Sequence, residues 1–175
     1  AASVVYSVHL NDHDSFFRFR SDVRAINAPA LAYLIEQCQS LKSLSLHDLD
    51  MAEYHCRVLG ALSRPGLEIE LKGCVITGFG ASALAEVLGR NQGPTKLERC
   101  EIDAFVLADG LRGNSRLKSV SLWIISSSLE VGDREVVAIA GALRENRGIV
   151  ELELRCSHSN MKYETWVTVC DSLKT

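Results

Sequence analysis

Two histidines near the N-terminus have the spacing of metal ligands. His9 and His13 stand four residues apart beside Asp12 and Asp14, and zinc takes imidazole and carboxylate ligands at such spacings. No further ligand follows close by in the sequence, so the segment is more typical of a polar turn after a strand. We therefore predict no metal site here.

Other residue pairs have the types needed for nucleophilic or phosphate chemistry. His55 and Cys56 are adjacent, but neighbouring residues of a helix point in different directions, which argues against a cysteine–histidine nucleophile. Cys156 and His158 form a weak ligand pair, and the segment GFGASA at 78–83 lacks the lysine of a phosphate-binding loop. The sequence therefore predicts a protein that is not an enzyme and holds no cofactor.

Length, charge and hydropathy narrow the class of protein. The 175 residues are 47% hydrophobic and 23% charged, which predicts one globular domain over residues 1–175. A net charge of −3 leaves no basic surplus for nucleic acid, and no apolar run approaches the roughly 20 residues that span a bilayer. We expect a cytoplasmic protein that binds neither nucleic acid nor membranes. The sequence lacks an initiator methionine, so we expect a trimmed chain or a piece of a longer one.

Six cysteines are present, and none forms a CxxC pair. Most lie within apolar patterns, where a thiol behaves as a small hydrophobic side chain. Since disulfides are rare inside cells, this usage predicts reduced cysteines in an intracellular protein.

The strongest pattern is an internal repeat. Five segments approximate L-x-x-L-x-L-x-x-C/N-x-L, counted from its first leucine as position one, and position six is leucine in each. These leucines are spaced by 25, 26, 25 and 32 residues: Leu46, Leu71, Leu97, Leu122 and Leu154. A fixed period of this length predicts repeated strand–helix units. Thr95 at position four of the third unit predicts a shortened or distorted strand, and the longer last gap predicts an expanded loop at 126–133.

Helical periodicity separates the strand segments. Apolar residues at i, i+3, i+4 and i+7 predict helices over residues 29–38, 52–62, 80–91, 103–114, 133–147 and 163–174. Asp103 and Asp133 are predicted N-caps. Asn91, Asn114 and Asn146 are expected to close three of the helices, since asparagine tolerates the left-handed cap conformation.

Stacked strand–helix units bury a continuous core, with parallel strands on one side and helices on the other. Residues 15–21 fit a further strand, with Phe17 and Phe19 at positions four and six. The alternating segment 3–10 predicts either another strand or one arm of a hairpin with 15–21 that covers the edge of the sheet.

The segments GASALAEVLGRN (80–91), LERCEI (97–102) and LADGLRGNSRLKSVSL (107–122) resemble the ribonuclease-inhibitor-like leucine-rich repeat family. The resemblance covers about residues 30–174. It implies an α/β fold, a right-handed leucine-rich-repeat solenoid or horseshoe, with the parallel β-sheet on the concave face and the helices on the convex face. About five to six repeats would lie in 30–175, and residues 1–29 would form an N-terminal strand or capping segment. The usual work of the family is protein recognition.

Positions five and seven of each unit are expected on the concave face, because positions four and six point into the core. Equal positions of successive units should lie about 4.8 Å apart, which places Glu70 beside Lys96 and Lys72 beside Glu98. The face is either a solvated charged surface or part of a partner's footprint. The predicted contact residues from this pattern are Glu70, Lys72, Lys96, Glu98, His47 and Arg155.

Trp123 and Ile124 complete the predicted partner site. With Val120 and Leu122 in the core and Ile125 at position nine, these two residues are expected to face outward. An exposed aromatic side chain at the centre of a face is a typical binding anchor. Two structural alternatives remain open: the loop at 126–133 covers Trp123, or a local slip of register places it inside.

The sequence thus predicts a non-catalytic scaffold that binds another protein through its concave face. The alternative is a regulator of an enzyme, such as a GTPase-activating or ubiquitin-ligase adaptor module, since leucine-rich repeat proteins of both kinds exist. The function rests in part on family analogy, because a fold alone does not determine it.

Overall fold

The computed structural model describes residues 4–10, 15–21, 32–33, 41–124, 129–156 and 162–172. Its strands are β1 (Val4–Leu10), β2 (Ser15–Ser21), β3 (Ser43–His47), β4 (Glu68–Lys72), β5 (Val75–Ile76), β6 (Lys96–Ile102), β7 (Ser119–Ile124) and β8 (Glu151–Cys156). The helices with described bounds are α2 (Glu53–Leu62), α3 (Gly78–Gly89), α4 (Ala104–Leu111), α5 (Leu129–Leu143) and α6 (Tyr163–Ser172).

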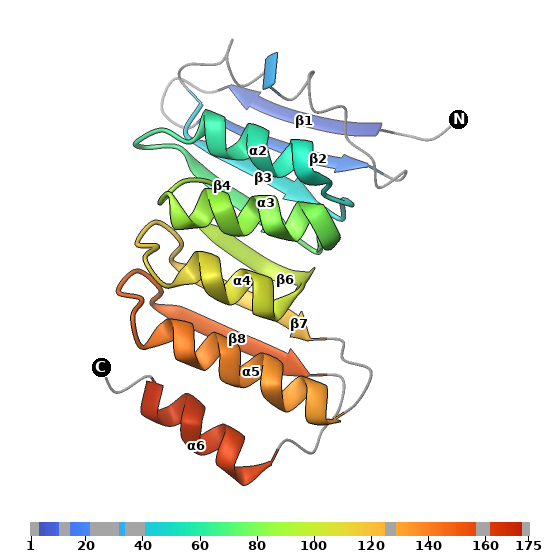
Figure 1. Cartoon of the computed structure of the whole chain (residues 1–175). Coiled ribbons are helices and arrows are strands. Elements are labelled where there is room, and N and C mark those ends of the chain that lie inside the picture. The colour runs from blue at the N-terminus through green and yellow to red at the C-terminus, as the bar shows by residue number, and fades with distance from the viewer. Residues whose placement is uncertain are drawn as a thin grey trace.

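The strands form one sheet in the order β1-β2-β3-β4-β6-β7-β8, with the short β5 paired to β6. β1 and β2 form an antiparallel hairpin, which confirms that arrangement of residues 3–10 and 15–21. All later pairs are parallel, and the helices lie side by side on one face of the sheet (Figure 1). We call the opposite face the open face. The α/β class and the parallel sheet are as predicted.

The register of the first four parallel strands follows the repeat. Phe19 lies opposite Leu46, Leu46 opposite Leu71, and Leu71 opposite Leu97, so position six forms an unbroken row. Leu46, Leu71 and Leu97 are fully buried and belong to one core cluster with α3 residues such as Leu84. This burial is the main stabilising contribution of each unit, at about 25 cal/mol per Å² of apolar surface.

A left-handed residue at position eight directly follows β3 and β4 and interrupts the regular pairing of β6 from within. Asp48, Gly73 and Arg99 have φ values of 55°, 63° and 54°. This conformation directs position nine into the core, where Cys74 Sγ donates to the carbonyl of Leu46 and Cys100 Sγ to that of Leu71. Each thiol therefore links its unit to the preceding one.

The fourth unit lacks this conformation, and the prediction for Ile124 is wrong as a result. A β-branched side chain disfavours the left-handed region, and β7 continues through Ile124, which pairs with Cys156 of β8. Side chains alternate along a strand, so Ile124 joins Val120 and Leu122 inside and is only 3% exposed. The register shifts between β6 and β7: Leu97 lies opposite Val120, and Cys100 opposite Leu122.

The third unit is distorted but not shortened. β6 has seven residues and carries the irregularity between Leu97 and Cys100. Thr95, at the leucine position before it, keeps its unit in register because its hydroxyl donates to the Ile69 carbonyl and accepts from the Ile69 amide, both at 3.1 Å. The distortion was predicted correctly, and the shortening was wrong.

The asparagines at the helix ends act in two ways. Asn91 has the left-handed conformation, with φ of 58°, as predicted. Asn114 and Asn146 instead use their side chains: Asn114 Nδ2 donates to the Leu88 carbonyl at 2.7 Å, and Asn146 Nδ2 donates to the Leu111 carbonyl at 2.5 Å. Both amides therefore tie a unit to its predecessor.

Only one of the two predicted N-caps is correct. Asp103 Oδ1 accepts from the amides of Phe105 and Val106 at the start of α4. Helix α5 begins at Leu129, so part of the predicted loop is helical and Asp133 lies inside the helix. Asp133 Oδ1 instead accepts from the Lys162 amide and the Thr165 hydroxyl, and thereby fixes the start of α6. The rest of the predicted loop, 126–128, lies outside the described residues.

Four cysteines are described with their surroundings, and all are free: Cys56, Cys74, Cys100 and Cys170. This agrees with the prediction of unpaired thiols for these four. Among the described helices, none has the length and apolar character to cross a lipid bilayer.

Candidate functional site

A chain of ion pairs crosses the open face over β4 and β6. Lys96 Nζ lies 3.0 Å from Glu70 Oε1 and 2.9 Å from Glu98 Oε2, while Lys72 Nζ contacts Glu98 Oε1 at 2.5 Å. Both predicted cross-strand pairs, Glu70–Lys96 and Lys72–Glu98, are confirmed. The pairs form because equal positions of β4 and β6 lie opposite each other.

The pairs shift the ionisation of their members. Hydrogen bonds from Lys72 and Lys96 lower the pKa of Glu98 to about 2, and hydrogen bonds to Glu98 and Glu70 raise the pKa of Lys96 to about 12. Burial alone would raise the pKa of Glu70, but hydrogen bonds from Ser45 and Lys96 outweigh it and leave the pKa below its usual value. All three groups are therefore charged at neutral pH.

His47 joins this chain through Ser45. Ser45 Oγ donates to Glu70 Oε2 at 2.7 Å and lies 2.7 Å from His47 Nε2. Because the hydroxyl gives its single hydrogen to Glu70, His47 Nε2 is the donor to Ser45 Oγ. Six side chains of β3, β4 and β6 thus form one polar network, with His47 at one end and Lys72 at the other. The histidine is oriented by the network rather than placed to activate the serine as a nucleophile.

Trp123 and Arg155 lie at the other end of the open face, on β7 and β8. They occupy opposed positions in the strand register, and the Trp123 side chain is 50% exposed. Arg155 is held by Glu153 at 2.8 Å. Trp123 is therefore neither buried by a slip of register nor fully covered. Ile124 contributes nothing to this surface because it is buried.

The register shift leaves a hollow between the two groups. A cavity of about 180 Å³ opens on the open face, and its charged lining consists of Lys96, Glu98, Arg99, Glu151 and Glu153. Its hydroxyl groups come from β7, where Ser119 donates to Glu151 and Ser121 to Glu153, both at 2.7 Å. Trp123 and Glu98 both occupy position seven but do not lie opposite each other, because the residue before Trp123, Leu122, pairs with Cys100.

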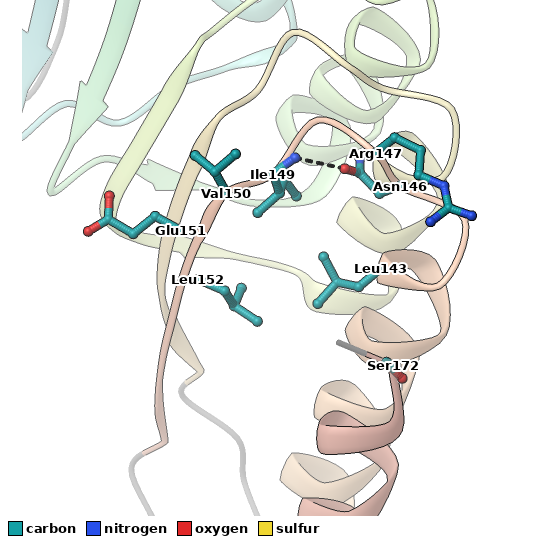
Figure 2. A pocket seen from close by; sticks show the side chains of 8 residues that line it. All are labelled: Leu143, Asn146, Arg147, Ile149, Val150, Glu151, Leu152 and Ser172. Carbon is teal, nitrogen blue, oxygen red and sulfur yellow. Dashed lines mark hydrogen bonds between the residues drawn. The ribbon is translucent and has the colours of Figure 1, made fainter. Parts of the chain in front are cut away.

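A larger cavity of about 420 Å³ lies at the far end of the sheet. Figure 2 shows Leu143, Ile149 and Leu152 facing it from the end of α5, the following loop and the start of β8. The side-chain oxygen of Asn146, which lines this cavity, already accepts hydrogen bonds from the amides of Gly148 and Ile149. None of the predicted contact residues lines this cavity, so it is not part of the candidate site.

The residue pairs considered for catalysis have structural roles where they are described. His55 Nδ1 accepts from the Ala52 amide at 3.0 Å at the start of α2. Cys56 points elsewhere, into the core, where burial raises the pKa of its thiol to about 12. His13 and His158 lie outside the described residues. Within the part of the chain that is described, no group of three or more His, Cys, Asp or Glu side chains could hold a metal ion.

Sequence reasoning placed Ser45 and Ser121 on the open face but missed their hydrogen bonds to Glu70 and Glu153, and it missed Arg99. Ser45 and Ser121 occupy position five, and position five of the next strand is a glutamate in both cases. This pairing could have predicted the hydrogen bonds between serine and glutamate. Arg99 lines the hollow and has a left-handed backbone conformation. An arginine in the sequence does not indicate that conformation, so no signal was available for this residue.

The open face therefore combines a fixed polar network, a charged hollow and a half-exposed tryptophan. A comparison of the chain with models of known protein families, and a search of curated proteins, gave no match.

Proposed function

We propose that the chain is a right-handed solenoid of the leucine-rich repeat type and a non-catalytic scaffold that binds another protein through the open, concave face of its sheet. Regular links between successive units support the solenoid. Four side chains each donate a hydrogen bond to a backbone carbonyl of the preceding unit. They are the thiols of Cys74 and Cys100 and the side-chain amides of Asn114 and Asn146.

The observation that carries the binding proposal is the half-exposed Trp123 on a face of otherwise fixed charges. An indole of this exposure offers a large apolar contact, and tryptophan is enriched among the residues that dominate binding energy. The ion-paired network beside it contains equal numbers of lysines and glutamates, Lys72, Lys96, Glu70 and Glu98. Such pairs favour a partner of complementary charge pattern more than they add affinity.

The proposal is tested with a variant that changes both features. The triple variant Glu70→Lys, Glu98→Lys and Trp123→Ala is compared with the unchanged protein as an immobilised bait, and recovered partners are identified by mass spectrometry. We expect partners of the open face to be lost from the variant. Recovery of every partner in equal amounts on both baits would exclude this face as the binding site.

A matched control reverses a charge on the helical side. Glu86 of α3 forms ion pairs with Arg57 at 3.1 Å and with Arg90 at 2.5 Å, so Glu86→Lys disturbs a comparable exposed network away from the open face. This variant should retain the partners. Thermal unfolding of all three proteins separates loss of a contact from loss of the fold.

A further inference from the structure

Three successive helices each carry an exposed aromatic side chain as their second residue. Tyr54 follows the first residue of α2, Phe79 that of α3 and Phe105 that of α4. Their exposed fractions are 54%, 82% and 40%. The intervals of 25 and 26 residues equal the strand period, so the same place in the repeat is aromatic three times. We call these residues the aromatic row.

The topology places the row along one edge of the molecule. The helices pack in chain order, α2 against α3 and α3 against α4, and all begin at the edge where the parallel strands end (Figure 1). Neighbouring packed helices lie about 8–10 Å apart. Equivalent residues on them are therefore separated by about the same distance, and the row crosses the helices rather than following one.

Arg134 of α5 marks the end of the row. Its guanidinium carbon lies 5.8 Å from the centroid of the Phe105 ring, within the range of a cation–π contact. The face of this ring thus already accepts a flat cationic group from the same chain.

Carboxylates accompany the row along the same edge. Asp50 and Glu101 flank Val75 in the short ladder just before the helices begin. Asp103 caps α4 two residues before Phe105, and Glu53, which forms an ion pair with Arg57 at 2.9 Å, directly precedes Tyr54. A partner of this edge therefore meets aromatic rings and negative charge together, and basic side chains complement it.

We propose that the aromatic row binds a proline-rich segment of another protein that carries basic residues and adopts the polyproline II conformation. This conformation has three residues per turn and a rise of about 3.1 Å, so every third residue recurs at about 9.3 Å. That repeat matches the spacing of adjacent helices, and a proline at every third position meets successive rings. Aromatic-lined surfaces recognise such segments.

Other modes of peptide recognition fit this edge less well. A helical partner needs a groove along its length, whereas the row runs across the helix ends. Addition of a strand needs an open strand edge, and α2, α3 and α4 offer none here. This site is distinct from the open face, and its test does not depend on that proposal.

The probe is a fluorescein-labelled nine-residue peptide, (Pro-Pro-Arg)₃, measured by fluorescence anisotropy against the full chain. The comparison peptide (Gly-Ser-Arg)₃ has the same charge but no preference for polyproline II. We expect saturable binding of the proline peptide and at least tenfold weaker binding of the comparison peptide. Equal binding of the two, or no saturable binding of the proline peptide, would overturn the proposal.

Phe79→Ala tests the row itself and should weaken binding of the proline peptide at least tenfold, whereas Phe79→Tyr should restore it. Val150, 83% exposed at the opposite edge, supplies the control: Val150→Ala should bind as the unchanged protein does, as should Trp123→Ala. An unchanged affinity of Phe79→Ala would contradict the proposal. So would dimerisation of the chain that Phe79→Ala abolishes, because it would assign the row to a second copy.

Discussion

Leu97 on β6 lies opposite Val120 on β7, whereas the repeat pattern alone pairs it with Leu122. This single relationship divides the open face. The ion pairs between β4 and β6 follow the repeat register. Across β6 and β7 the register is shifted, so that Trp123 lies closer to the end of β6 than Glu98 does. The hollow lined by Arg99 and Glu153 lies at this shift.

Gly73 holds the turn after β4, and its replacement should destabilise the protein. At its φ of 63° a side chain is strained, and an added Cβ would lie 2.5 Å from Asp48 Oδ1. Gly73→Ala should lower the free energy of unfolding by about 1–3 kcal/mol, measured by urea denaturation. Gly89→Ala is the control, since nothing lies within 4 Å of an added Cβ there. An equal loss in both variants would contradict the strain argument.

Asn114 should be among the most sensitive polar residues. Its side chain is buried, donates to the Leu88 carbonyl and accepts from the Leu117 amide, both at 2.7 Å. Asn114→Ala leaves two backbone groups without partners, each costing about 1–3 kcal/mol. The expected result is a clear fall in the thermal midpoint, while Ser82→Ala on the exposed side of α3 should change it little. A stable Asn114→Ala protein would show that these bonds are replaceable.

Glu98 should make stability depend on acid pH. Its pKa is about 2 in the folded protein against 4.5 as the ordinary value, so the unfolded chain binds a proton at higher pH than the folded one. The stabilisation is complete above pH 4.5 and is lost as the pH falls towards 2. Glu98→Gln should therefore show a shallower loss of stability over this window, measured by urea midpoints at successive pH values. Identical slopes for the two proteins would refute this assignment.

The thiols should differ sharply in reactivity. Cys56, Cys74 and Cys100 are buried, whereas Cys170 is exposed, and burial raises the pKa of Cys56 to about 12. Among these four described thiols, reaction of the folded protein with iodoacetamide, mapped by mass spectrometry, should label Cys170 first and the three buried thiols only with urea. Early labelling of Cys56 in the folded protein would contradict the packing of α2. Cys170→Ser provides the control for assignment of the first labelled peptide.

Much of the fold follows from periodicity alone. Leucine at position six predicts the register from Phe19 to Leu97 because each of these side chains must enter the same core layer. The pattern fails at Ile124. Whether a residue at position eight faces outward or inward depends on its backbone φ angle, which is positive in the first three units. Asp48, Gly73 and Arg99 share that angle without sharing a residue type, so the one sequence signal for its loss in the fourth unit is the β-branched side chain of Ile124.

The candidate surfaces divide in the same way. The pairing of Glu70 with Lys96 follows from register and charge, and it was predicted. The role of Asp133 was missed because a long gap between repeats suggested a loop, whereas the residues extend α5 by a turn. The aromatic row was visible in the spacing of Tyr54, Phe79 and Phe105, but those residues lie outside the strand motif that defined the repeat.

The bonds from Asn114 and Asn146 to the preceding unit have a mechanical consequence. A tension applied to the two ends of the chain is carried by the links between neighbouring units, since the principal contacts join successive elements. The terminal helix α6, fastened to α5 in part by Asp133, has a neighbour on one side only within the described chain. Stretching should therefore detach α6 before the interior units, giving a stepwise extension rather than a single rupture.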